Sequence, residues 1–111
     1  MDADGTLIMY SEEILGLGSL TLTLAKGSTT GKTKVNTVSP AATGTNTYVY
    51  KIDSVAQSVT YDTVLTVGWT TITPGTTDIA ATAGQIITVA EIDSGNKAKA
   101  VGTVTVIDNI A

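Results

Sequence analysis

The chain has 111 residues and a net charge of −4 at pH 7, and only 14% of its residues are charged. That length suits one domain with a single hydrophobic core. Histidine, cysteine and arginine are absent, which excludes disulfides, thiolate zinc sites and histidine-based catalysis, and argues against binding of nucleic acid.

The N-terminal segment differs from the rest of the chain because it lacks regular alternation. Residues 6–10 are apolar enough for a short strand or an extended arm, and residues 11–15 could form one helical turn with Ser11 as its N-cap. Gly16 and Gly18 would end that turn. No signal peptide is visible, because the first five residues carry two aspartates and no positive charge, and no long apolar run follows. We therefore expect residues 1–18 to form an N-terminal arm or edge strand.

From residue 19 onward, threonine, which supplies roughly a fifth of the chain, alternates with aliphatic residues. Alternation with a period of two is typical of half-buried β-strands. Glycine-rich polar turns at residues 26–31 and 93–96 separate such runs and predict hairpins. The predicted strands cover residues 19–25, 32–38, 47–52, 63–69, 78–79, 85–92 and 97–106.

Seven or eight short strands with a turn every 8–12 residues indicate an all-β fold, either a small antiparallel β-sandwich or a related small barrel. We expect residues 19–111 to form this single domain. The chain has no phenylalanine, so its core must be built mainly from valine, isoleucine, leucine and alanine. No apolar run approaches the ~20 residues of a membrane span.

The aromatic residues allow more than one interpretation. Tyr48 and Tyr50 lie on one face of a predicted strand, and Trp69 is the single tryptophan. These side chains could anchor the core, form an aromatic surface that binds sugars, or lie at an oligomer interface.

Two motifs resemble functional sites without meeting their requirements. Residues 27–33 resemble a phosphate-binding loop, but the required first glycine is replaced by Lys26 and a strand follows. Residues 2–5 resemble the start of a calcium loop, but the later acidic residues do not fit. Among the carboxylates, nothing in the spacing singles out a catalytic pair. We therefore expect no enzyme activity, catalytic residue, metal site or cofactor.

Three segments, residues 27–35, 46–51 and 87–106, carry a resemblance to the small immunoglobulin-like (Ig-like) β-sandwich modules of phage virions and bacterial surface proteins. The resemblance implies a structural or adhesive role and an Ig-like sandwich. The leading hypothesis is a phage capsid decoration (cement) protein on the virion surface. It would bind the major capsid protein or other virion subunits, assemble as a homo-oligomer with a trimer favoured, and contact neither nucleic acid nor membrane.

In this hypothesis the N-terminal arm binds the partner. The expected contact residues of the arm are Leu7, Ile8, Met9, Tyr10, Ile14 and Leu15. Two alternatives remain open, namely an Ig-like spacer or adhesin on a bacterial cell surface, and a carbohydrate-binding module.

Overall fold

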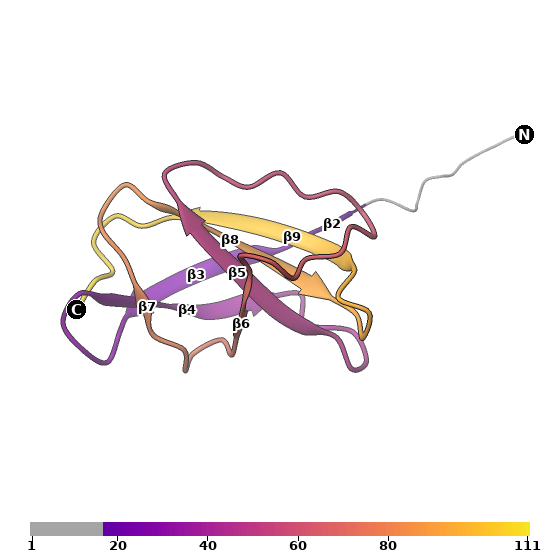
Figure 1. The fold of residues 1–111 in the computed structure, drawn as a ribbon. Coiled ribbons are helices and arrows are strands. Elements are labelled where there is room, and N and C mark those ends of the chain that lie inside the picture. The colour runs from indigo at the N-terminus through magenta and orange to yellow at the C-terminus, as the bar shows by residue number, and fades with distance from the viewer. Residues whose placement is uncertain (1–16) are drawn as a thin grey trace, which may run out of the picture.

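The computed structural model describes residues 17–111, which form two β-sheets packed face to face (Figure 1). This confirms the predicted all-β, Ig-like sandwich. None of the described residues belongs to a helix that is long and apolar enough to cross a membrane. The strands are β2 (Gly18–Ser19), β3 (Thr21–Lys26), β4 (Lys32–Ser39), β5 (Thr47–Asp53), β6 (Thr70–Ile72), β7 (Ile79–Ala80), β8 (Ile86–Ile92) and β9 (Ala98–Thr105).

The two sheets have the strand orders β2-β9-β8-β5-β6 and β3-β4-β7. Both predicted hairpins are present, as β3–β4 and β8–β9. In the β8–β9 turn the carboxylate of Asp93 accepts hydrogen bonds from the backbone N–H groups of Gly95 at 2.8 Å and Lys97 at 3.0 Å. Asn96 takes a positive φ of 63°, a conformation that asparagine tolerates better than most residues. The sequence resembling a phosphate loop is likewise a hairpin turn, between β3 and β4.

One stretch of chain contributes to both sheets. Strand β2 runs parallel to β9, with Gly18 opposite Ala100, and the N–H of Leu20 then donates to the carbonyl of Val101 at 2.9 Å. Immediately afterwards, β3 joins β4 in the other sheet. A Cβ atom added to Gly102 would lie 2.2 Å from the carbonyl oxygen of Leu20. The crossing between sheets therefore requires glycine at position 102.

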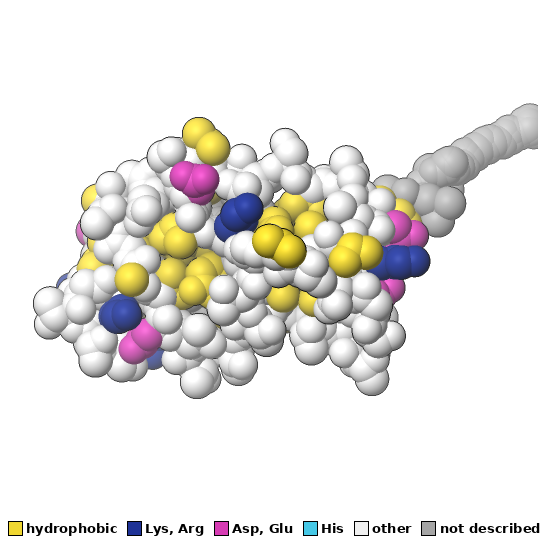
Figure 2. Space-filling model, viewed as in Figure 1, with side chains coloured by type: hydrophobic (Ala, Val, Ile, Leu, Met, Phe, Trp, Pro, Cys, Tyr) yellow, Lys and Arg dark blue, Asp and Glu magenta, His cyan; other side chains and the backbone are white. Residues whose placement is uncertain are grey.

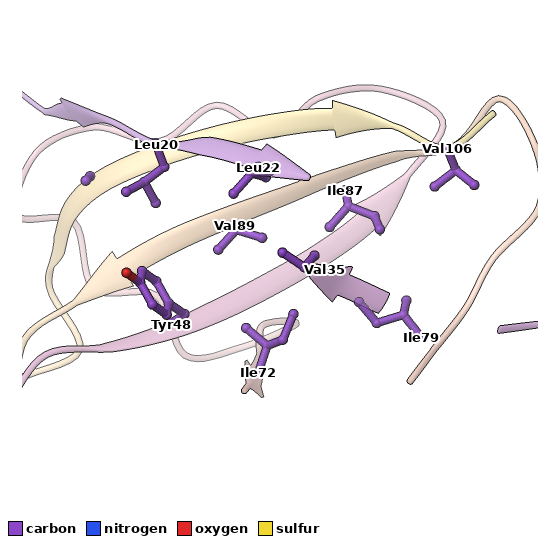
Figure 3. Packing of buried hydrophobic residues seen from close by; sticks show 10 residues of the cluster. Leu20, Leu22, Val35, Tyr48, Ile72, Ile79, Ile87, Val89 and Val106 are labelled. Atoms are coloured by element: carbon purple, nitrogen blue, oxygen red, sulfur yellow. The ribbon is translucent and has the colours of Figure 1, made fainter. Parts of the chain in front are cut away.

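The main core lies between the two sheets and is almost entirely aliphatic (Figure 3). Ile87 and Val89 of β8 face Val35 of β4, and all three side chains are fully buried. Alternation explains this arrangement, because every second residue of a strand points into the space between the sheets.

A second apolar cluster covers the opposite face of the five-stranded sheet. It contains Leu65 from the connection between β5 and β6, together with Ala90 and Ile92 of β8, and Trp69 packs against it. Strand β8 is consequently buried on both faces, including Thr88, whose hydroxyl accepts a hydrogen bond from the N–H of Gln57 at 3.1 Å. The connection, residues 54–69, acts as a cover over this sheet.

The predicted strand at residues 63–69 is wrong. Only Val64 forms an isolated bridge there, with Lys97, and the strand of this region is β6, immediately after it. Positive φ angles at Asp62 and Gly68 bend the chain at each side of this stretch. The alternation of threonine and aliphatic residues here therefore belongs to an irregular segment that buries Leu65 while it crosses the sheet.

Candidate functional site

A charged cluster holds the cover segment against the β8–β9 hairpin. The ammonium group of Lys99 pairs with the carboxylate of Asp62 and lies 3.6 Å from a carboxylate oxygen of Asp93. The same nitrogen lies 4.6 Å from the centre of the Tyr61 ring, within the range of a cation–π interaction. Every charge in this cluster has a partner of opposite sign, so the cluster is suited to joining segments of the fold.

The ionisation of this cluster follows from its contacts. The hydrogen bond to Asp62 raises the pKa of Lys99 above its ordinary value. Hydrogen bonds from the backbone of Lys97 and then Gly95, with the nearby charge of Lys99, lower the pKa of Asp93 despite some desolvation. Both groups remain charged at neutral pH, so neither is prepared to transfer a proton there.

Glu91 is a buried carboxylate, with 5% of its surface exposed. One of its oxygens accepts hydrogen bonds from the backbone N–H of Thr43 at 3.0 Å and from the side-chain amide of Asn46 at 2.9 Å. It thereby fixes the β4–β5 loop, residues 40–46. Burial, and then the charge of Glu91, raise the pKa of Tyr48, whose hydroxyl donates to the carbonyl of Pro40 at 3.1 Å. Glu91 and Tyr48 together stabilise one end of the sandwich.

The sequence carries a signal for this buried carboxylate, although Glu91 was not among the site residues predicted from it. Glu91 is the single charged residue of β8 and shares its parity with Ile87 and Val89, which lie in the core. A charge in register with core positions indicates either burial with hydrogen-bond partners or the end of the core. No comparable signal exists for the pair of Lys99 and Asp62, because those residues meet only through the tertiary fold.

The aromatic residues named from the sequence do not form one surface. Tyr48 is buried and Tyr50 partly buried in the core between the sheets. Trp69 packs on the other cluster, across the five-stranded sheet from the tyrosines. The structure therefore separates the side chains that a flat sugar-binding platform would have to combine.

The other named contact residues lie in the proposed N-terminal arm. Leu7, Ile8, Met9, Tyr10, Ile14 and Leu15 are outside the described residues. Within residues 17–111 there is no group of three or more acidic side chains arranged to hold a metal ion, and no pocket forms.

The surface offers mainly hydroxyl and backbone groups for contact. Thr21, Thr23 and Thr37 are exposed on the outer face of the three-stranded sheet, where the hydroxyls of Thr23 and Thr37 lie 2.6 Å apart. In the view of Figure 2, uncharged polar and backbone atoms dominate, and the hydrophobic side chains form several small separate patches. Such a surface can pack against other proteins with little desolvation of charge.

Comparison with known proteins identifies relatives of this fold. The family model of the S-layer protein SbsC C-terminal domain matches residues 25–109. A comparison with curated proteins finds no significant match. The crystal structure of S-layer protein SbsC domains 7, 8 and 9 is similar with a TM-score of 0.73 and 30% sequence identity, covering 85% of this chain. The structure of surface layer protein SbsC domains 4–9 is similar with a TM-score of 0.70 and 33% identity, covering 86%.

The chain spans 30% of the first of those solved chains and 15% of the second. These matches correct the leading hypothesis. A phage capsid decoration protein, bound to the major capsid protein as a trimer on the virion, is wrong, since the family and both structures belong to bacterial surface layers. The strand and turn patterns behind the resemblance do not distinguish the two classes, and the bacterial surface module is the supported alternative. The chain belongs to the family of the S-layer protein SbsC C-terminal domain.

Proposed function

We propose that this chain is a non-enzymatic structural module of a bacterial surface layer, which works by packing against neighbouring modules and subunits at the cell surface. The observation that carries the proposal is the family match over residues 25–109, together with the structural match at 30% identity. The names of those relatives are names of surface-layer proteins, and this chain is similar to them in fold.

The positions of the first described strand and of the last residue support this role. Strand β2 begins beside Ala100, near the β8–β9 turn. At the other end, Ala111 exchanges backbone hydrogen bonds with the β3–β4 turn, from the N–H of Gly31 at 2.8 Å and to the carbonyl of Lys32 at 2.9 Å. The described chain thus enters at one end of the sandwich and leaves at the other (Figure 1). Modules with this geometry can be joined one after another, and both solved chains that match contain several numbered domains.

The contacts of three carboxylates, one buried (Glu91) and two near the surface (Asp62 and Asp93), also support a structural role. The carboxylates of Glu91, Asp62 and Asp93 each hold two segments of the fold together. Such groups stabilise the module without supplying a nucleophile or a proton to a substrate.

The proposal can be tested on cells that produce the chain. We expect antibodies raised against residues 17–111 to label the outer surface in immunogold electron microscopy, with a periodic pattern in surface fragments. A cytosolic protein probed in the same sections provides the control. Label confined to the cytosol, or found on purified phage particles instead, would contradict the proposal.

A further inference from the structure

The most distinctive unassigned feature of the described chain is one edge of the five-stranded sheet. An edge strand presents unpaired backbone N–H and C=O groups, which can pair with a strand of another chain. Among residues 17–111, the outer side of β9 is covered only in its first part, where the N–H of Ala98 donates to the carbonyl of Thr63 and β2 pairs with Ala100 and Val101. Beyond Val101 the covering chain crosses to the other sheet.

The alternating hydrogen bonds between β8 and β9 show which backbone N–H and C=O groups of β9 this crossing leaves unpaired. The carbonyl of Val101 accepts from Leu20, on the side away from β8, whereas the N–H of Val106 donates to Gln85 on the β8 side. Because successive residues of a strand point their backbone groups to opposite sides, the backbone groups of Thr103 and Thr105 point away from β8. No strand among the described residues pairs with them there.

Two other edge strands, β3 and β6, carry features that oppose pairing. Strand β3 ends in Lys26 and has an irregular register at residues 23–24, and β6 has three residues and is followed closely by Pro74. Charges, bulges, short length and proline are the usual protection of edge strands. Residues 101–107 contain no charge and no proline, and Ile107, two residues after the end of β9, is 70% exposed.

We propose that the edge formed by Thr103–Thr105 pairs antiparallel with the same edge of a second copy of this chain, joining two five-stranded sheets into one continuous sheet. The pairing has a twofold axis at Val104, so Thr103 of one copy lies opposite Thr105 of the other. This inference rests on the proposed function, for which it supplies one contact between subunits.

Length and charge both favour a second copy as the occupant. The unpaired stretch of the β9 edge is short, because Leu20 crosses at Gly102 and the chain bends at Ile107. A long partner strand would collide with Leu20, whereas the same edge of another copy has the same short length. The two edges place threonine opposite threonine, a favourable cross-strand pair, and bring no like charges together.

Cross-linking can test the register directly, because the natural chain has no cysteine. Directly opposed residues in a hydrogen-bonded pair have Cα atoms about 5.5 Å apart, within the roughly 4.4–6.8 Å that a disulfide needs. Identical positions would be diagonal neighbours at about 7–8 Å. We expect a mixture of Thr103→Cys and Thr105→Cys chains to form the mixed disulfide at least about tenfold faster than either variant alone.

Thr21→Cys, on the exposed β3 edge, is the matched control and should cross-link with either variant only at the collision rate. Equal rates for all combinations would overturn the proposal. A dominant disulfide between the positions 21 and 103 or 105 would also overturn it, because the β9 edge would then pair with β3.

Charge substitutions supply a second, independent test, in which sedimentation measures self-association. Protein concentrations up to about 1 mM are needed, because the surface area buried by so small a contact lies far below the ~1,600 Å² of a stable complex. We expect the wild type to self-associate, the variants T103K/T105K and T103E/T105E each to lose about tenfold or more in association, and their equimolar mixture to regain it. Circular dichroism confirms that each variant folds. Association of the variants equal to that of the wild type, or a wild type that stays monomeric, would overturn the inference.

The two proposals fail separately. Periodic immunogold label on cells, combined with no β9 cross-link, would reject the edge contact alone. Absence of surface label would reject the surface-layer function, whatever the cross-linking shows.

Discussion

Replacing Gly102 by alanine tests how closely the chain packs where it crosses between the sheets. The new Cβ would lie 2.2 Å from the oxygen and 2.9 Å from the carbonyl carbon of Leu20. These are backbone atoms, so relief requires the segment around Leu20 to move. That movement breaks the hydrogen bond from Leu20 to Val101 and partly exposes the Leu20 side chain, which is buried in the core.

The cost can be estimated from these two losses. An unsatisfied backbone pair costs about 1–3 kcal/mol, and partial exposure of a buried leucine costs about 1–2 kcal/mol. Alanine returns about 0.5–1 kcal/mol because it is less flexible than glycine in the unfolded chain. We therefore expect Gly102→Ala to lower the free energy of unfolding by about 2–3 kcal/mol, and the melting temperature by roughly 10–20 °C for a domain of this size.

Urea unfolding followed by circular dichroism measures the effect. Gly95→Ala is the matched control, because its Cβ would meet only the carboxylate of Asp93 at 3.4 Å, and it should change the free energy by less than about 0.5 kcal/mol. If Gly102→Ala were as stable as the control, the close crossing of Leu20 over β9 would be refuted. The same result would also refute the steric explanation for why the chain after β2 leaves the β9 edge at this point.

Three further substitutions, with a fourth at an exposed site as a control, probe the core, the buried carboxylate and the turn. Ile87→Ala, at a fully buried site, should cost about 3–4 kcal/mol, whereas Val67→Ala, at a site 91% exposed, should leave the urea midpoint nearly unchanged; similar losses at both would contradict the assigned core. Glu91→Ala removes the acceptor of two hydrogen bonds. We expect the free energy of unfolding to fall by about 2–3 kcal/mol and amide hydrogen exchange in residues 40–46 to become faster. Unchanged exchange there would show that another contact fixes the loop. Because the folded pKa of Asp93 lies below the ordinary value of an aspartate, its contribution to stability is present above that ordinary value and is lost as the pH falls through the folded pKa. The stability difference between wild type and Asp93→Asn should therefore shrink as the pH is lowered from neutral through and below the ordinary pKa of an aspartate, and a difference independent of pH would refute this cause.

Local pattern was sufficient where each residue's role depended on its own strand. The β8–β9 hairpin was predicted because two alternating runs flank a turn whose residues suit it, notably Asp93 and Asn96. The same logic predicted β4 and β5. It failed at residues 63–69, since a segment that buries Leu65 while crossing a sheet shows the same alternation as a strand.

The candidate contact surfaces were less predictable than the fold. The sequence directed attention to the N-terminal arm, which is outside the described residues, and to aromatic residues that the sheet separates. The open part of β9 could not be recognised from sequence, because residues 98–105 read as one uniform strand. Only the crossing at Leu20 divides that strand into a covered half and an open half.

Composition, alternation and turn residues are enough to establish a β-sandwich with an aliphatic core and few reactive groups, because these signals act locally or over the whole chain. Three other features follow only from the folded arrangement: β8 is buried on both faces, Lys99 meets Asp62, and no described strand pairs with the outer edge of β9 at Thr103–Thr105. Each of them depends on where a distant segment crosses the sheet, and neither strand period nor turn chemistry encodes that path.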